Sequence, residues 1–434
     1  MQKVLIIGFG KSGRSAALFL LKKGKKVIAA DQKAADLLKD PAIVQMQKEG
    51  LELVSDKREG IDFSSIAQVV LSPGIIPFHP LVLEARKRKI EMIGEIELGF
   101  RHFKNPAIGI TGTNGKTTVT LLCAHVLQEC GIKATALGNM GTALTSFSGG
   151  KEEVLVVELS SYQLETLQQE CLDVAVILNL TPDHLDRYPS FQEYADAKCR
   201  IKEAVKKGGK LFLSRQAAGQ KTALLEGESS ALFDETSDLK GRRSIAKLIS
   251  GKNLPVNQEN ALAAYRLCSF FGVKEAPFMK ALKSFKAPPH RIEWAGEVRG
   301  VHFYNDSKAT NIESVIHAVK TLSGPIHLIV GGLDKGSSYA PWKNAFKGKV
   351  KRLYAIGFAA KKIQQELESD LDIVLAASLF DAVQKAFDCA EKKEQILLSP
   401  GCASFDSFRN YEHRGEEFMR FVQELQALNQ GGLA

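Results

Sequence analysis

This chain lacks the cysteine spacing that a structural zinc site or a disulfide framework would need. Its seven cysteines are an odd number, and no two of them have C-x-x-C spacing. Such usage favours a reducing compartment and argues against structural zinc. The chain also has no apolar run as long as a membrane span, and the first expected strand, beginning at Lys3, leaves no room for a signal sequence. We therefore expect a cytoplasmic protein with no membrane partner.

An arginine-rich tract interleaved with aromatic residues is also missing. The formal net charge is +9 at pH 7, but the basic residues are scattered in short groups such as residues 86–89. We interpret these groups as solvated faces and expect no nucleic-acid partner. A small anionic substrate fits the positive charge equally well.

The length and the order of apolar segments predict the architecture. At 434 residues the chain exceeds what one hydrophobic core usually serves, and it has no internal repeat. Strand-like runs alternate with helical stretches, which predicts an α/β fold with mainly parallel sheets. We expect a Rossmann-like domain at 1–92, a central P-loop ATPase-like domain at 93–287 and a second Rossmann-like domain at 288–434. Pro288 and Pro289 would form the last linker, and residues 214–246 should be irregular or peripheral.

The most informative motif follows the apolar run at residues 107–110. A strand that ends in a glycine-rich loop and opens a helix directs backbone N–H groups and the positive helix end at one point, which suits a polyphosphate. Lys116 would supply a mobile charge for the phosphates, and Thr117 a hydroxyl for Mg²⁺. The strict Walker A pattern fails only because Ile110 stands where its first glycine would be. The predicted ATP loop consists of Gly112, Thr113, Asn114, Gly115, Lys116, Thr117 and Thr118.

A second glycine-rich turn lies near the amino terminus. Gly8, Gly10 and Gly13 follow an apolar run, and Asp31 stands 18 residues after Gly13. This spacing matches the dinucleotide fingerprint G-x-G-x-x-G with its acidic residue. It indicates a phosphorylated nucleotide at the helix start, and an NAD-dependent dehydrogenase is one open interpretation. That interpretation leaves Lys116 and the third domain unexplained.

Polar side chains follow several other expected strands. Glu158 ends an apolar run, where its carboxylate can meet a metal held by Thr117. His184 lies beyond the next strand and Lys198 in an expected helix, and each alone would more commonly be a structural histidine or a surface lysine. In the third domain, cationic and hydroxyl side chains gather at strand ends, which suits the carboxylates of a substrate.

Together these motifs resemble the Mur ligases, ATP-dependent amino-acid ligases that build the peptidoglycan stem peptide. The resemblance covers essentially the whole chain, and residues 183–188 and 306–311 are most similar to the D-glutamate-adding members. The D-N-P-R motif of the diaminopimelate- or lysine-adding members is absent from the third domain. The resemblance implies that ATP phosphorylates the carboxylate of UDP-N-acetylmuramoyl-L-alanine. The amine of D-glutamate then attacks the acyl phosphate to give the amide, ADP and phosphate.

The resemblance also implies residue roles. Thr117 and Glu158 would serve one Mg²⁺, and His184 and Lys198 a second. Because a cationic lysine cannot bind Mg²⁺, Lys198 would be carbamylated by CO₂. The catalytic residues would be Lys116, His184 and Lys198. Further ATP contacts would be Asn257, Asn260, Arg291 and Asp306. The UDP-substrate would contact Ser12, Gly13, Asp31, Gly74 and Asn139. D-glutamate would contact Lys308, Thr310, Lys335, Ser404 and Tyr411.

Other readings of the sequence remain open. A folylpolyglutamate synthase-like ligase has a similar P-loop and also adds glutamate, but it has no equivalent of residues 1–92. A nucleotide-gated binding module would hold ATP without turnover. The Mur ligase interpretation implies a monomeric enzyme of peptidoglycan synthesis, with effects on cell shape and cell division.

Overall fold

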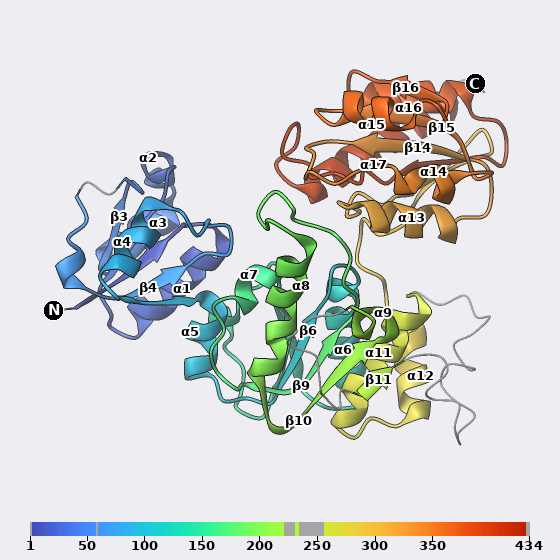
Figure 1. Ribbon diagram of the computed structural model, residues 1–434. Helices are drawn as coiled ribbons and strands as arrows, with labels where there is room; N and C mark the ends of the chain where they lie inside the picture. The colour runs from blue at the N-terminus through green and yellow to red at the C-terminus, as the bar shows by residue number, and fades with distance from the viewer. Residues whose placement is uncertain (1, 58–59, 221–230, 234–255, 431–434) are drawn as a thin grey trace. The chain divides into compact units, whose positions relative to one another are not determined.

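The computed structural model describes residues 2–57, 60–220, 231–233 and 256–430. Its strands form three sheets that follow one another along the chain (Figure 1). The chain divides into two compact units, Met1–Leu180 with Gln192–Lys286, and Thr181–Phe191 with Ala287–Ala434. The predicted three-domain α/β architecture is confirmed. The exact domain boundaries stay a prediction.

The first sheet has five parallel strands in the order β3-β2-β1-β4-β5. Alternate residues of β1 pack on opposite faces, which are covered by different helices. From β1 the chain adds β2 and β3 on one side of the sheet and then β4 and β5 on the other. The strand order therefore reverses between β1 and β4, the place where open α/β sheets bind ligands. The strands are β1 (Lys3–Ile7), β2 (Val27–Ala30), β3 (Leu51–Val54), β4 (Ile66–Leu71) and β5 (Glu91–Gly94). The helices are α1 (Lys11–Lys22), α2 (Ala34–Leu37), α3 (Pro41–Lys48), η1 (Phe63–Ser65), α4 (Pro80–Lys87) and α5 (Glu95–His102).

The second sheet has six parallel strands in the order β11-β10-β9-β6-β8-β7. Helices α6, α11 and α12 share one core on a face of this sheet. The strands are β6 (Ala107–Thr111), β7 (Ala134–Gly138), β8 (Val154–Glu158), β9 (Leu172–Ile177), β10 (Val205–Ser214) and β11 (Ala231–Phe233). The helices are α6 (Lys116–Glu129), η2 (Leu144–Ser146), α7 (Ser161–Leu164), α8 (Phe191–Cys199), η3 (Arg200–Ala204), α9 (Arg215–Ala218), α11 (Gln258–Phe270) and α12 (Glu275–Ser284).

Residues 214–246 were expected to be irregular or peripheral, and where they are described they form regular structure that lies at the edge of the second sheet. They include α9 and the edge strand β11, which pairs with β10. The strand has only three residues, too few for an apolar period to stand out in the sequence. The rest of this segment, at 221–230 and 234–246, lies outside the described residues.

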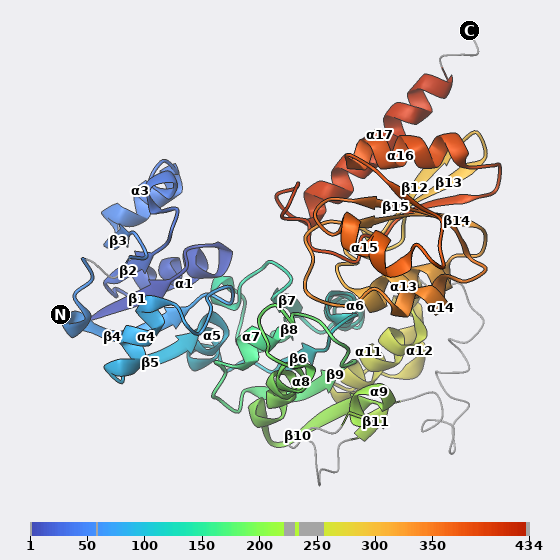
Figure 2. The same cartoon turned by 45° about the horizontal axis from the view of Figure 1, so that its top comes forward.

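The third sheet has the order β12-β13-β17-β14-β15-β16. Figure 2 shows α13, α14 and α15 on one face of it and α16 and α17 on the other. The strands are β12 (Glu293–Val298), β13 (Val301–Asn305), β14 (Ile326–Gly331), β15 (Val350–Ile356), β16 (Ile373–Leu375) and β17 (Gln395–Leu398). The helices are α13 (Ile312–Thr321), α14 (Pro341–Phe346), α15 (Ala360–Leu367), α16 (Leu379–Cys389) and α17 (Tyr411–Gln430).

Strand β12 is an antiparallel addition that the sequence analysis did not predict. It forms a hairpin with β13 across Arg299 and Gly300, whose φ angles are 52° and 79°. Two central residues with positive φ are typical of the two-residue turns that join antiparallel strands. The Arg-Gly pair between the two strands was therefore the missed signal.

Helix α5 explains why the first two sheets fall in one compact unit. Its Glu95 and Glu97 are buried, and both accept hydrogen bonds from the backbone of the central region. Thr145 N donates to Glu95 Oε1 at 2.6 Å, and Gln168 N donates to Glu97 Oε2 at 2.8 Å. Burial raises the pKa of Glu95. In the part of the chain that the structure describes, no helix has both the length and the apolarity to cross a membrane.

Candidate active site

The turn between β6 and α6 has the backbone that a phosphate-binding loop needs. Gly115 is the N-cap of α6 with a φ of 85°, and Gly112 has a φ of 145°. A Cβ at Gly115 would lie 2.5 Å from Asn260 Oδ1. The positive φ favours glycine at position 115, and a side chain there would also displace the Asn260 amide. Strand, glycine loop and helix occur in the predicted order.

Asn179, which was not among the predicted site residues, fixes the shape of this loop. It accepts from Thr113 N through its backbone oxygen at 2.9 Å and from Asn114 N through Oδ1 at 2.7 Å. Lys116 Nζ donates to the carbonyl oxygens of Gly112 at 2.9 Å and Thr113 at 2.8 Å. The ammonium is thus folded over the loop itself. Asn179 follows β9, so its place after a strand was the available signal.

Glu158 lies at the end of β8, the strand next to β6, and pairs in register with Ile110. Its side chain is 2% exposed, and Asn139 Nδ2 donates to its Oε1 at 2.9 Å. Its Oε2 is buried without a hydrogen-bond partner. A buried carboxylate oxygen left unsatisfied is costly, and a cation would remove that cost.

The ligand count decides what kind of metal could bind there. No group of three or more His, Cys, Asp and Glu side chains suited to a metal ion occurs among the described residues. A dedicated protein cage is therefore absent from that part of the chain. Mg²⁺ does not need one, because it commonly binds one or two protein oxygens together with phosphate oxygens and water. Glu158, with one carboxylate oxygen unsatisfied, fits that pattern.

Helix α8 carries Lys198 into the protein interior. Lys198 is 2% exposed, which is far from the usual state of a helical lysine. Its Nζ lies 4.8 Å from the ring centroid of Tyr194, four residues earlier on the same helix face. Tyr194 Oη in turn donates to Thr113 Oγ1 at 3.2 Å. The face of α8 that carries Lys198 thus packs against the glycine loop.

Two of the predicted nucleotide contacts lie beside this loop as well. Asn257 is the N-cap of α11, and its Oδ1 accepts from Asn260 N at 2.8 Å. Asn260 is buried against Gly115. The first compact unit therefore brings together the glycine loop, Asn260, Glu158, Asn139 and the helix of Lys198.

The amino-terminal glycine loop is held by a different set of contacts. Asp31 Oδ2 accepts from Phe9 N at 2.7 Å, and its Oδ1 accepts from Lys33 N at 2.8 Å. A Cβ at Gly13 would lie 2.1 Å from Gly8 O, so helix α1 approaches β1 as closely as backbone allows. Both oxygens of the Asp31 carboxylate are thus engaged with backbone. In a dinucleotide site the corresponding acid binds the ribose hydroxyls.

A pocket of about 300 Å³ opens beside this loop, at the carboxyl ends of β1 and β2. The lining includes Gly8, Asp31, Lys33, Asp56 and His79. The other predicted UDP-substrate residues of this sheet are Ser12, in the first turn of α1, and Gly74, in the turn after β4.

In the second compact unit, Asp183 is the centre of a buried polar cluster. It is 6% exposed, and it accepts from Lys335 Nζ at 3.1 Å and from Asn311 Nδ2 at 3.3 Å. The neighbouring His184 has a φ of 56°, and its N–H donates to Asp183 Oδ1. Residues 181–191 therefore pack with residues 287–434, although the predicted central domain includes them.

Asp306, which directly follows β13, is a second buried carboxylate of this unit. Ser399 Oγ donates to its Oδ2 at 2.8 Å, and Ile292 N donates to its Oδ1 at 3.3 Å. Burial raises the pKa of Asp306 to about 7, although the Ser399 hydrogen bond and the charge of Arg291 partly oppose this. Burial of Asp306 thus favours the protonated form of its carboxyl group.

The predicted D-glutamate residues are connected by a side chain that the sequence analysis missed. Arg414 is 1% exposed and donates to Ser307 Oγ at 3.0 Å, Ser307 O at 2.9 Å and Cys402 O at 3.2 Å. Burial lowers its pKa to about 10. It ties residues 306–308 to the loop that carries buried Ser404. Lys308 Nζ lies 3.6 Å from the ring centroid of Tyr411.

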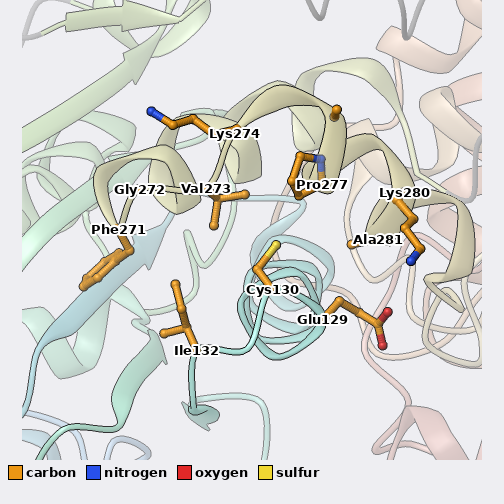
Figure 3. A pocket seen from close by; sticks show the side chains of 11 residues that line it. Glu129, Cys130, Ile132, Phe271, Gly272, Val273, Lys274, Pro277, Lys280 and Ala281 are labelled. Carbon is orange, nitrogen blue, oxygen red and sulfur yellow. The ribbon is translucent and has the colours of Figure 1, made fainter.

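A larger cavity, of about 650 Å³, lies at the far end of α6 from the glycine loop. Figure 3 shows Cys130 pointing across it toward Pro277. Its lining includes Lys274 and Lys280 but no residue predicted to bind a substrate. A helix of 14 residues separates the two places by about 20 Å.

Comparison with known proteins extends over the whole chain. Family models match for the MurD-like N-terminal domain of Mur ligases at 2–94, the Mur ligase middle domain at 110–235 and the Mur ligase glutamate ligase domain at 290–402. The UDP-N-acetylmuramoylalanine--D-glutamate ligase of Protochlamydia amoebophila is 47% identical over 437 residues, which cover 98% of each chain. The enzyme of that name from Koribacter versatilis is 38% identical over 451 residues, again with 98% of each chain covered.

Solved structures show the same fold. The UDP-N-acetylmuramate-alanine ligase MurC of Thermotoga maritima has a TM-score of 0.61 at 16% identity, covering 98% of this chain and 100% of that one. The MurF ligase of Thermotoga maritima in complex with ADP has a TM-score of 0.58 at 14% identity, covering 93% and 95%. With three matching domains and extensive full-length identity, this chain belongs to the Mur ligase family.

Proposed function

We propose that this protein is an ATP-dependent ligase that joins D-glutamate to UDP-N-acetylmuramoyl-L-alanine, with ADP and phosphate as the other products. The observation that carries this proposal is the glycine loop after β6, next to a buried Glu158 with one unsatisfied carboxylate oxygen. Full-length identity of 47% to an enzyme of that name supports the choice of substrates.

The first chemical step would transfer the γ-phosphoryl group of ATP to the alanyl carboxylate. Negative charge then spreads over the transferring oxygens, and fixed donors lower the barrier because they need no reorganisation. Backbone N–H groups at 112–118 and the ammonium of Lys116 would be those donors. Asn257, Asn260, Arg291 and Asp306 would bind the rest of the nucleotide.

Thr117 and Glu158 would hold one Mg²⁺, and His184 with carbamylated Lys198 a second. When bound, Mg²⁺ neutralises charge on phosphate oxygens. The orphaned Glu158 Oε2 supports the first assignment. The burial of Lys198 supports the second, because the helix face that carries it lies against the glycine loop through Tyr194 and Thr113.

The second chemical step would be attack of the D-glutamate amine on the acyl phosphate. Ammonium and hydroxyl groups suit its two carboxylates, and a hydrogen-bonded cation is the strong form of such a contact. Lys308, Thr310, Lys335, Ser404 and Tyr411 would bind D-glutamate. The loop geometry around Ser307 and Ser404 would depend on Arg414.

The amino-terminal loop would fasten the UDP part of the substrate. Ser12, Gly13, Asp31 and Gly74 lie at the carboxyl end of the first sheet, while Asn139 lies beside Glu158. No observation favours the dehydrogenase or the folylpolyglutamate synthase-like alternative. We further propose that the enzyme acts as a cytoplasmic monomer in peptidoglycan synthesis, and so influences cell shape and division.

Phosphate release with a panel of amino acids tests donor and acceptor together. With ATP, Mg²⁺ and UDP-N-acetylmuramoyl-L-alanine, D-glutamate should give rapid release, whereas L-glutamate, L-lysine and diaminopimelate should give almost none. Omitting the UDP-substrate is the matched blank. Release that is independent of the UDP-substrate, or that is greatest with another amino acid, would contradict the proposed function.

A further inference from the structure

The pocket of about 300 Å³ beside the amino-terminal glycine loop contains a polar pair that none of the assignments above uses. Asp56 and His79 both line it, and their side chains are 17% and 11% exposed. His79 Nε2 lies 3.3 Å from Asp56 Oδ2. The other lining groups include Asp31, Lys33 and the apolar Ile75. The pocket is thus small, partly apolar and furnished with both donors and acceptors.

The proton position on His79 follows from its second contact. His79 is the N-cap of α4, and its Nδ1 accepts a hydrogen bond from Leu81 N at 3.3 Å. An accepting nitrogen carries no proton, so in the neutral ring the proton is on Nε2. Nε2–H therefore donates to Asp56 Oδ2. One carboxylate oxygen of Asp56 is occupied in this way, and within the part of the chain that the structure describes the other has no donor, so it can accept from a ligand.

Asp31 and Asp56, the two acids of the pocket, differ in how many of their carboxylate oxygens already accept a hydrogen bond. Asp31 receives Phe9 N on one oxygen and Lys33 N on the other, so both of its oxygens already accept from backbone. Among the described residues, Asp56 is held on one oxygen only, by His79. A ligand that presents an N–H group to this pocket would therefore find its best acceptor in Asp56.

We propose that Asp56, oriented by His79, is the residue that reads the base of the substrate, accepting a hydrogen bond from N3–H of uracil. This inference rests on the proposed function, in which a uridine diphosphate lies on the glycine loop. Uracil presents one donor, N3–H, between two carbonyl acceptors, and the Lys33 ammonium complements such carbonyls. Cytosine has an unprotonated N3, which a carboxylate repels. Asp56 would thus be a specificity-determining residue.

The inference makes a specific prediction for Asp56→Asn. His79 Nε2–H can donate only to an acceptor, so it would hold the amide oxygen of the new side chain. The amide NH₂ would then face the base. An NH₂ group suits N3 of cytosine and opposes N3–H of uracil, so the preference should reverse rather than merely weaken.

Calorimetry with the full chain can test this with UDP, CDP and N3-methyl-UDP as probes. The wild-type protein should bind UDP about 30-fold more tightly than either of the other two, since each leaves a polar group mismatched. Asp56→Asn should bind CDP at least as well as UDP. Asp36→Asn, an exposed carboxylate of the same domain that pairs only with Lys39 in the described structure, is the matched control and should behave as wild type.

The outcomes separate this inference from the proposed function. If wild-type protein turns over the UDP-substrate but binds UDP and N3-methyl-UDP equally, the inference is wrong and the ligase assignment stands. The same holds if Asp56→Asn, with an unchanged melting temperature, keeps the wild-type preference for UDP. If wild-type protein neither binds UDP nor releases phosphate with the UDP-substrate, both fall. The methylated probe needs no variant, so a folding defect in Asp56→Asn cannot hide the answer.

Discussion

The molecule contains two glycine loops built on the same plan. In each, a buried parallel strand ends in glycines and a helix begins with a lysine, Lys11 in α1 and Lys116 in α6. Their surroundings differ. Asp31 holds the first loop with one carboxylate oxygen, on Phe9 N, and its other oxygen accepts from Lys33 N in the turn after β2, whereas the amide of Asn179 holds the second loop. The carboxylate next to the second loop, Glu158, keeps one oxygen without a partner.

This difference explains how one backbone plan can serve binding in one place and chemistry in another. Either loop can accept phosphate on its N–H groups and helix end. The second has a lysine folded over it and, in Glu158, a buried acid with an unsatisfied oxygen on the neighbouring strand. We therefore expect substitutions at the first loop to change substrate affinity and stability, and substitutions at the second to change the rate of phosphoryl transfer.

The largest effect should come from Lys116→Ala. Removing a cation that stabilises charge only in phosphoryl transfer should lower kcat about 10³-fold or more, with little change in melting temperature. The matched control is Lys11→Ala, at the same helix position of the other loop, where the side chain is exposed. It should change kcat less than threefold. Equal losses in the two variants would break the comparison between the loops.

Lys198→Ala should have the next largest effect. If the carbamate supplies an anionic ligand, its loss should lower kcat by about 10² to 10³, and short carboxylates added to the assay should restore part of the activity. Lys207→Ala, an exposed lysine of the same domain, is the control. Full activity of Lys198→Ala, or no restoration by any carboxylate, would contradict the proposed role.

The buried acid of the third sheet extends the comparison to pH. Folded Asp306 keeps its proton up to about pH 7, whereas the unfolded chain loses it near 3.8. Between these values the folded state binds more protons, so stability should fall as pH rises, by an amount on the order of 4 kcal/mol at most. Asp306→Asn removes this pH-dependent loss of stability. The melting temperature of the variant minus that of wild type should therefore increase from pH 4 to pH 8.

A matched variant isolates that pH effect from general charge. Asp372, at the other side of the third sheet, is exposed and pairs with Arg352. Asp372→Asn should follow the wild-type pH profile. If Asp306→Asn also follows it, then Asp306 is ionised in the folded protein throughout this range, contrary to its burial.

The smallest of these effects concerns the first loop. In Gly13→Ala the new methyl group would meet Gly8 O at 2.1 Å, so α1 must move, at a cost of about 2 to 3 kcal/mol. Gly10→Ala is the control, because its Cβ would meet nothing within 4 Å and its φ is −74°. A melting temperature lowered equally by both substitutions would mean that this loop is not held by close packing of α1 on β1.

Much of the fold could be predicted because its strands and loops correspond to local patterns in the sequence. The apolar runs that became β1, β8 and β17 are contiguous in the sequence, and the glycine loops follow their strands directly. The hairpin of β12 was missed because its signal was one Arg-Gly pair. Contacts such as Asp183 with Lys335, 152 residues apart, cannot be predicted from spacing at all.

The candidate site likewise contains residues that the sequence pattern indicated and residues that only the folded chain reveals. The type and order of Lys116, Thr117 and Glu158 indicated phosphate and metal chemistry without any structure. Lys198 and Arg414 did not stand out, because a charged residue in a helix is normally exposed and only the folded chain reveals that both are buried. Assigning Lys198 needed the family resemblance, and Arg414 was missed.

Titration of the intact protein with UDP-N-acetylmuramoyl-L-alanine, with and without a saturating non-hydrolysable ATP analogue, tests the division between the two loops most directly. We expect one site for each ligand, and both sites should be filled at the same time. NAD should displace neither ligand. Lys116→Ala should weaken binding of the ATP analogue without weakening binding of the UDP-substrate. Competition between the two ligands for one site, or displacement of the UDP-substrate by NAD, would contradict this expectation.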